Sequence, residues 1–167
     1  MKKAILFLLI AICISTVYGQ KEIDNCTKIH QLIEKALTKK LALESKESIP
    51  TEDLEMWKAT TILAGTKSCY IQDAYAYKMY VADFEYSSGN KLDERVAKRF
   101  MDVSNQLNNC LKNEFSQTIL TSSEVVLKGV DYNGLGKYDN VKIQLYVIYN
   151  PADKKQTLFM SLMYDPG

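Results

Sequence analysis

Histidine is nearly absent from this chain of 167 residues, which contains His30 alone. A zinc site built on several histidines and an HExxH metalloprotease motif are therefore excluded. The sequence also lacks a Ser-His-Asp arrangement, a GxSxG nucleophile motif and the glycine-rich loops that hold phosphate groups. Glycine and proline are few, with seven and three residues. We therefore predict no catalytic residues, no cofactor and no metal.

The chain also lacks an excess of charge of either sign. Its 21 basic residues face 20 acidic ones, which gives a formal net charge of +1. Nucleic-acid binding proteins usually carry a clear basic patch, and proteins that dock on anionic membranes carry a basic stripe. The sequence shows neither feature, so we predict no nucleic-acid partner.

Only one long hydrophobic run is present, and it lies at residues 4–14 behind Lys2 and Lys3. With the small residues Val17 and Gly19 ahead of Gln20, this pattern predicts a secretory signal peptide over residues 1–19 that is removed. The run is too short for a bilayer, which needs about 20 residues. A lipoprotein anchor at Cys13 is disfavoured, because Ile12 occupies the position of a small residue. We expect a secreted or periplasmic protein with no membrane insertion after cleavage.

Three cysteines remain after cleavage, which allows one internal disulfide and one unpaired thiol. Three pairings are possible on paper. Cys26 opens the first predicted helix and Cys110 lies near the end of the second, so antiparallel packing of these helices favours a Cys26–Cys110 disulfide. Cys69 is then expected to be a buried apolar residue. A reactive Cys69 is the alternative, although the sequence has no Cys-x-x-Cys motif.

Hydrophobic periodicity predicts an α+β fold in a single domain, residues 20–167. One helix is expected from Ile23 to about Leu43, and a second follows Asn90, which we expect to cap it. The order is α-β-β-α-β-β-β, with both amphipathic helices on one face of an antiparallel sheet of five to six strands. The strands are expected at residues 57–64, 69–73, 77–86, 117–128, 141–149 and 156–164.

Strand alternation assigns each side chain to the helix-covered face or to the opposite, open face. In the tyrosine-rich stretch, Tyr80, Ala82, Phe84 and Tyr86 are assigned to the core. Exposed aromatic residues and methionines are typical of interfaces. The leading hypothesis is therefore a non-catalytic secreted domain that contacts a protein partner, or forms a homodimer, through this face. A register error of one residue would exchange the two faces. The residues predicted to be on the open face are Tyr77, Met79, Val81, Tyr146, Ile148, Phe159 and Met163.

The stretch "DYNGLGKYDN", residues 131–140, is predicted to be a hairpin tip with Tyr132 and Tyr138 as contact residues. Tyrosine combined with glycine suits binding loops. The first alternative function is thus an inhibitor or immunity-type protein that blocks a hydrolase or toxin with this loop. The carboxylates in it do not have the spacing of an EF-hand calcium loop.

A second alternative is a glycan-binding protein or an enzyme that uses Asp83 and Glu85. These carboxylates are two apart on a predicted strand and so are expected on one side of it, as a carboxylate pair for glycoside cleavage requires. Cys26 and His30 also share a helix face, but a disulfide at Cys26 would remove that thiol from any chemistry. Asn25 begins an N-x-Ser/Thr pattern, which matters for glycosylation only in a eukaryote.

Overall fold

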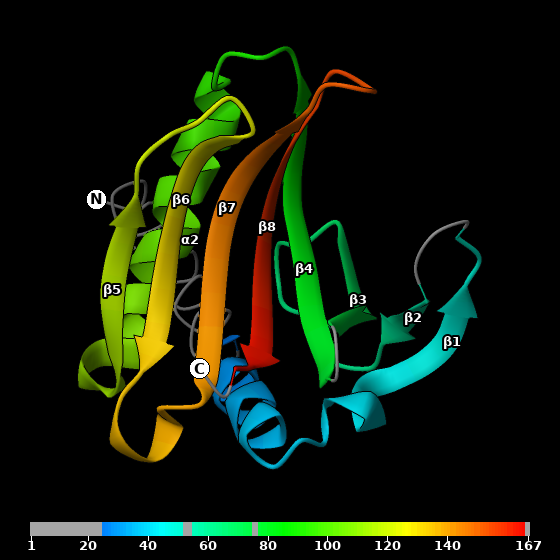
Figure 1. Ribbon diagram of the computed structural model, residues 1–167, viewed down its shortest axis with the longest axis vertical. Coiled ribbons are helices and arrows are strands. Elements are labelled where there is room, and N and C mark those ends of the chain that lie inside the picture. Colours follow the sequence, from blue (N-terminus) through cyan, green and yellow to red (C-terminus); the bar gives the residue numbers. More distant parts are fainter. Residues whose placement is uncertain (1–24, 52–54, 75–76, 166–167) are drawn as a thin grey trace, which may run out of the picture.

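The computed structural model describes residues 25–51, 55–74 and 77–165, so the predicted signal peptide lies outside the described residues. The fold is α+β, with two helices and one antiparallel sheet (Figure 1). The first helix occupies residues 25–37 of the described part. The remaining elements are the 3-10 turns η1 (Leu41–Glu44), η2 (Lys112–Glu114) and η3 (Gly136–Tyr138), the helix α2 (Glu94–Leu111) and the strands β1 (Ser45–Ile49), β2 (Met56–Ala59), β3 (Ser68–Ala74), β4 (Tyr77–Ser88), β5 (Phe115–Leu120), β6 (Val126–Gly134), β7 (Val141–Asn150) and β8 (Lys155–Tyr164).

The sheet has eight strands in the order β1-β2-β3-β4-β8-β7-β6-β5 rather than the five to six predicted. One additional strand is β1, whose sequence SKESI carries exposed charged residues and resembles a polar loop. Charge is tolerated there because β1 is an edge strand. The other arises because the single strand predicted at residues 117–128 is divided into the end of β5, a connection and the start of β6.

The topology repeats one unit, a helix followed by four antiparallel strands, although the sequence shows no repeat. The first helix precedes β1–β4 and α2 precedes β5–β8. The last strands of the two units, β4 and β8, pair with each other in the middle of the sheet. Both halves therefore contribute to one continuous surface on each side of the sheet.

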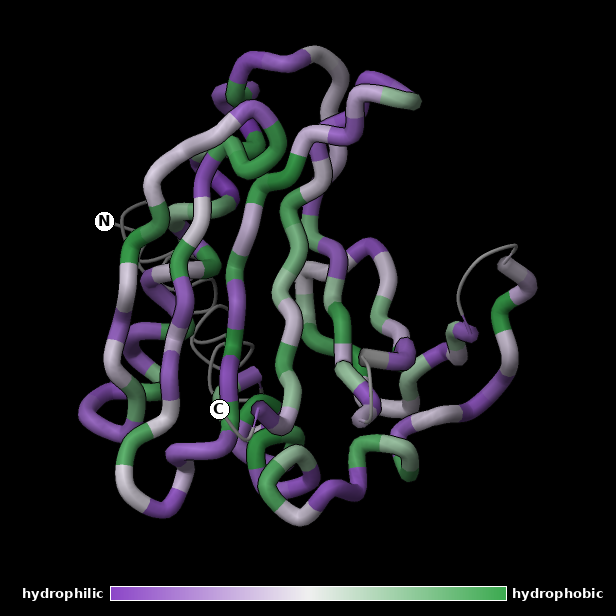
Figure 2. The backbone as a smooth tube through the Cα atoms, in the orientation of Figure 1, coloured by the Kyte–Doolittle hydropathy of each residue, from purple (hydrophilic) through white to green (hydrophobic). Residues whose placement is uncertain are grey.

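The hydrophobic core lies between the sheet and the two helices, which Figure 1 shows on the same side of the sheet. In β7 the odd residues Val141 to Val147 are buried and the even residues are partly exposed, so the predicted alternation is confirmed. In β8 both faces are largely apolar from Leu158 to Met163, and hydrophobic residues run along this central strand (Figure 2). Apolar residues therefore also point away from the helices here, so the second face of the sheet is partly apolar as well.

Helix α2 begins at Glu94 with Asp93 as its N-cap, not Asn90 as predicted. The Asp93 carboxylate accepts hydrogen bonds from the backbone N–H groups of Arg95 and Val96 at 2.9 and 3.3 Å. Gln156, fully buried, accepts from the Asp93 N–H and donates to the carbonyl oxygens of Gly89 and Lys91. The loop is thus held by a residue 63 positions away in the sequence, which no local pattern could reveal.

The predicted Cys26–Cys110 disulfide is confirmed, with a Cα–Cα distance of 5.2 Å across a sequence separation of 84. It joins the start of the first helix to the end of α2. His30, one turn after Cys26, lies with its Nε2 3.1 Å from the Cys110 carbonyl oxygen. Cys69 is unpaired and buried, as expected. Among the described residues, two cysteines thus form a disulfide and the third is a buried thiol.

A buried carboxylate fixes the chain where the first helix leads into β1. Glu44 is 1% exposed and forms an ion pair with Lys35 of the first helix. Its carboxylate also accepts hydrogen bonds from the Thr60 hydroxyl at 2.6 Å and the Thr61 N–H at 2.9 Å. Burial alone would raise the pKa of Glu44, but these hydrogen bonds together lower it from 4.5 to about 2.

Candidate functional site

The open face consists of the side chains of the sheet that point away from both helices. The strand registers arrange these side chains in rows across the sheet. One row contains Tyr146, Phe159, Asp83 and Ser68. The next contains Asp131, Gln144, Ser161, Val81 and Tyr70, and a third contains Asn133, Lys142, Met163, Met79 and Gln72.

The centre of the open face is apolar and aromatic. Tyr146 and Phe159 are cross-strand partners in an edge-to-face contact, with ring centroids 5.9 Å apart. Met79 and Met163 are partners across β4 and β8, and both are partly exposed. Val81 is only 2% exposed. The accessible apolar surface of the open face therefore comes from the rows on either side of Val81. These rows contain Tyr146 and Phe159 on one side and Met79 and Met163 on the other.

A polar cluster around Asp131 borders this aromatic centre. The Tyr146 hydroxyl donates to Asp131 Oδ1 at 2.5 Å, and Lys142 Nζ lies 3.1 Å from Oδ2. Gln144 Nε2 lies 2.7 Å from the Tyr146 hydroxyl, and the Ser161 hydroxyl donates to Gln144 Oε1 at 3.3 Å. Burial and the neighbouring Asp131 carboxylate raise the pKa of Tyr146, so its hydroxyl remains a donor at neutral pH.

Gly129 provides the space that Tyr146 needs. The two residues are partners across β6 and β7, and a Cβ atom at Gly129 would lie 3.0 Å from Tyr146 Cδ1. A side chain at this position would require the Tyr146 ring, and the Leu120 side chain beside it, to shift by about a few tenths of an ångström. The glycine is therefore part of the open face, although it carries no chemistry of its own.

A second polar cluster surrounds Asp83 on β4. The carboxylate is 7% exposed and accepts hydrogen bonds from the hydroxyls of Ser68 and Tyr86, each at 2.8 Å. Burial raises the pKa of Asp83, and these two hydrogen bonds partly oppose that change. Burial, followed by the proximity of Asp83 and Tyr86, raises the pKa of Tyr70. Both carboxylates of the open face are thus already paired with protein donors.

An irregularity in the β4–β8 register, between Asp83 and Glu85, changes the face assignment of the residues that follow it. Glu85 lies opposite Leu158, a core residue, whereas Asp83 lies opposite Phe159 on the open face. The prediction that both carboxylates share one side is therefore wrong, because a bulge shifts alternation by one residue. Tyr86, predicted in the core, is 40% exposed. The arrangement that motivated the carboxylate enzyme is not formed.

Three of the tyrosines predicted for contact with a partner lie elsewhere. Tyr132 is 2% exposed, and its hydroxyl lies 3.0 Å from that of Ser104 on α2. Tyr138 is 5% exposed and its ring stacks on Phe115. Tyr77 packs against Tyr164 below the end of the first helix rather than on the open face.

The 131–140 loop therefore has a different surface from the one predicted. Asp131 to Gly134 belong to β6, and the exposed residues of the connection are Leu135, Gly136, Lys137 and Asp139. Adding a Cβ atom at Gly134 would place it 1.8 Å from the Tyr138 carbonyl oxygen. This close approach folds the connection back on itself and buries Tyr138. The loop lacks the tyrosine–glycine contact surface on which the inhibitor hypothesis was based.

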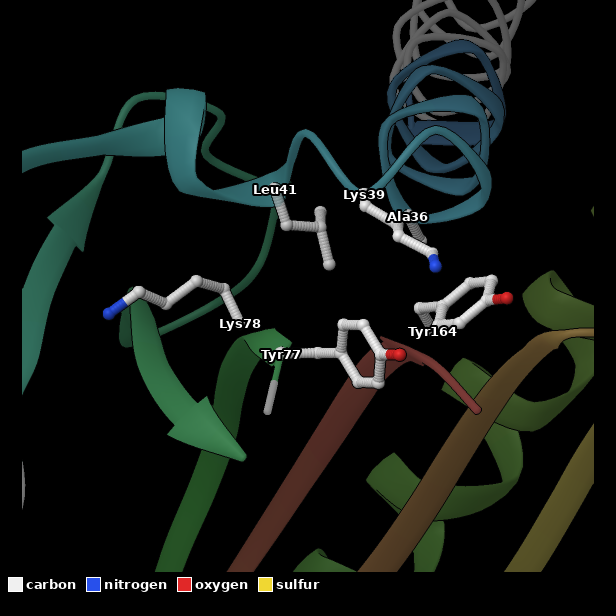
Figure 3. A pocket seen from close by; sticks show the side chains of 6 residues that line it. All are labelled: Ala36, Lys39, Leu41, Tyr77, Lys78 and Tyr164. Atoms are coloured by element: carbon white, nitrogen blue, oxygen red, sulfur yellow. The ribbon is translucent and has the colours of Figure 1, made fainter. Parts of the chain in front are cut away.

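A cavity of about 300 Å³ lies where the first helix ends against β4 and β8 (Figure 3). Lys39 Nζ lies 4.6 Å from the ring centroid of Tyr164 and 5.3 Å from that of Tyr77. The two rings contact each other at 4.9 Å with an interplanar angle of 64°. No local sequence pattern indicates this site, because its lining residues come from three segments that are distant in the sequence. Its lining residues are Ala36, Lys39, Leu41, Tyr77, Lys78 and Tyr164.

Two further features of the described residues concern metal binding and glycosylation. No group of three or more His, Cys, Asp or Glu side chains that could hold a metal ion occurs in residues 25–51, 55–74 and 77–165. Asn25 is 7% exposed, and its side-chain amide exchanges two hydrogen bonds with the backbone of Ala64, at 2.7 and 3.2 Å. A glycan on this nitrogen would disrupt that pair.

The described residues combine an α+β fold with an aromatic sheet face that neither helix covers and a small tyrosine-lined cavity. Comparisons with protein-family models, with curated proteins and with solved structures found no match. Within the part of the chain that the structure describes, neither helix has the length and apolar character needed to cross a bilayer.

Proposed function

We propose that this protein is a secreted or periplasmic, non-catalytic domain that binds a protein partner through the open face. The observation that carries the proposal is the group of partly exposed apolar and aromatic side chains on the open face, which neither helix covers. Tyrosine, phenylalanine and methionine are enriched in protein interfaces, and lysine is depleted. Phe159 lies at the centre, between Tyr146 and Asp83.

The hydrogen bonding of the open face favours a separate protein partner over an obligate second copy. Asp131 and Asp83 are each held by tyrosine hydroxyls of the same chain. Since these buried polar groups are satisfied without a partner, the domain can fold and persist alone, and binding does not leave an unpaired charge. Obligate dimer interfaces are usually more apolar than this face.

The test compares Phe159→Glu and Ile148→Lys with the matched control Met101→Glu. Phe159 and Ile148 lie on β8 and β7, whereas Met101 lies on α2 and is 48% exposed. Light scattering of the purified proteins first gives the oligomeric state. Affinity capture from the native extract then compares partner recovery by the wild type and the three variants, each shown to be folded by circular dichroism.

We expect a monomeric wild type, loss of the captured partner in both open-face variants and retention of it in Met101→Glu. A wild-type dimer that Phe159→Glu converts to a folded monomer would show that a second copy occupies the face instead. Equal recovery by the wild type and both folded open-face variants would contradict the proposal.

A further inference from the structure

The cavity at the end of the first helix combines an ammonium group with two tyrosine rings. In the described part of the chain, Lys39 forms no ion pair and neither the Tyr77 nor the Tyr164 hydroxyl forms a hydrogen bond with the protein. The Lys39 ammonium lies beside the two rings and is held by cation–π contacts alone (Figure 3). Figure 3 shows the Lys39 ammonium above the Tyr164 ring and the Tyr77 hydroxyl directed toward Tyr164, whereas the Tyr164 hydroxyl is directed away from Tyr77. In the described part of the chain, the Lys39 ammonium and the Tyr77 hydroxyl are thus two donor groups at the cavity without a protein acceptor.

The second lysine of the cavity has a different role. Lys78 forms an ion pair with Asp73, and its Nζ lies 3.7 Å from the centroid of the Trp57 ring. Figure 3 shows its ammonium directed away from Tyr77 and Tyr164. Lys78 therefore lines the cavity with its aliphatic stem, while the ammonium of Lys39 faces the rings.

The backbone of Lys39 determines where that ammonium lies. Lys39 follows the first helix with φ = 58°, and its N–H donates to the Ala36 carbonyl oxygen at 2.9 Å. Helices commonly end in this left-handed conformation, and glycine adopts it at the lowest cost. A glycine would also fit this backbone conformation but would remove the ammonium that lies beside the two rings.

We infer that this cavity binds a small organic monocarboxylate. A carboxylate would accept a charge-assisted hydrogen bond from Lys39 and a hydrogen bond from the Tyr77 hydroxyl, with the Tyr164 ring as one wall of the site. Ala36 and Leu41 supply an apolar wall for a single ring or a short branched chain. The cavity volume of about 300 Å³ lies at the lower end of the range for ligand sites.

The surroundings favour one negative charge over two. The site lies at the C-terminal end of a helix, where the helix dipole is unfavourable for anions. A single lysine can offset this effect for a monocarboxylate, whereas inorganic phosphate usually requires arginine, several lysines or a helix N-terminus. The site is on the helix side of the sheet, so the inference does not depend on the proposed role of the open face.

The experiment titrates the intact mature protein with benzoate and follows amide chemical shifts by NMR. Benzamide, which has the same shape without the charge, and inorganic phosphate serve as ligand controls. Lys39→Met removes the ammonium but keeps the length of the side chain. Lys40→Met is the matched protein control, because Lys40 is an exposed neighbour that does not line the cavity.

We expect saturable benzoate shifts around Tyr77 and Tyr164 in the wild type and in Lys40→Met. Benzoate should bind Lys39→Met about tenfold or more weakly than it binds the wild type, and benzamide should bind the wild type more weakly than benzoate by a similar factor. The reason is that a hydrogen bond to a charged group strengthens binding by about tenfold or more. Tyr77→Phe keeps the ring but removes the hydroxyl, and it should weaken benzoate binding by a smaller factor. Absence of saturable shifts, equal affinity in Lys39→Met, or tighter binding of phosphate would overturn the inference.

Discussion

Replacement of Glu44 by glutamine tests whether one buried carboxylate anchors the first unit of the fold. The side chain keeps its size but loses its charge, so the ion pair with Lys35 disappears. The hydrogen bonds from the Thr60 hydroxyl and the Thr61 N–H would then end on a neutral oxygen. Because Glu44 connects the first helix to the segment after β2, we expect the substitution to lower the free energy of unfolding.

The magnitude follows from the pKa of Glu44, which folding lowers from 4.5 to about 2. Each pKa unit corresponds to about 1.4 kcal/mol, so the charged form contributes roughly 3 kcal/mol to stability near neutral pH. A carboxylate with a lowered pKa in the folded state gives its full contribution above its unfolded-state value of about 4.5. The contribution is lost as the pH falls from about 4.5 towards 2.

Urea unfolding of the wild type and Glu44→Gln, followed by circular dichroism at several pH values between 7 and 2.5, measures this contribution. We expect a difference of roughly 3 kcal/mol at pH 7 that shrinks steadily below pH 4.5. Glu47→Gln is the matched control, because Glu47 forms an exposed ion pair with Lys58 and should have a much smaller effect. A stability difference that is the same at pH 7 and pH 3 would refute the role assigned to Glu44.

Two further predictions concern the disulfide and the β6–β7 connection. Replacing Cys26 and Cys110 with alanine should lower the free energy of unfolding by about 4 kcal/mol, because the disulfide closes a separation of 84 residues. Urea unfolding measures this change, and an unchanged urea midpoint would contradict the expectation. Gly134→Ala should lower stability by about 4 kcal/mol or more in thermal unfolding, because its Cβ would lie 1.8 Å from the Tyr138 carbonyl oxygen. Leu135→Ala, at the neighbouring exposed position, is the control and should have little effect, so equal losses in both variants would argue against the steric explanation.

Local patterns in the sequence were sufficient for the fold class and for most of the core. Alternation along β7 and β8 separated the core residues between Val141 and Val147 and between Leu158 and Leu162 from the neighbours that point to the open face, because a regular strand turns successive side chains to opposite faces. The disulfide was also predictable, since only one pairing brings the start of one helix to the end of an antiparallel one.

Errors in the predicted site arose where the backbone departs from regular geometry. The bulge in β4 moved Tyr86 to the open face and separated Glu85 from Asp83. The close approach at Gly134 buried Tyr138. Neither departure has a clear local signal, because a bulge or a tight turn is stabilised by the strands on either side of it.

The sequence by itself determined the α+β class, the two amphipathic helices, the sulfur pairing and the presence of apolar residues on both faces of the central strands. Only the tertiary structure decided the strand order β1-β2-β3-β4-β8-β7-β6-β5, the polar clusters at Asp131 and Asp83, and the cavity at Lys39. Periodicity reports which side of its own element a residue occupies. A site is made when residues from distant elements meet, and their meeting depends on strand pairing and register across the whole sheet.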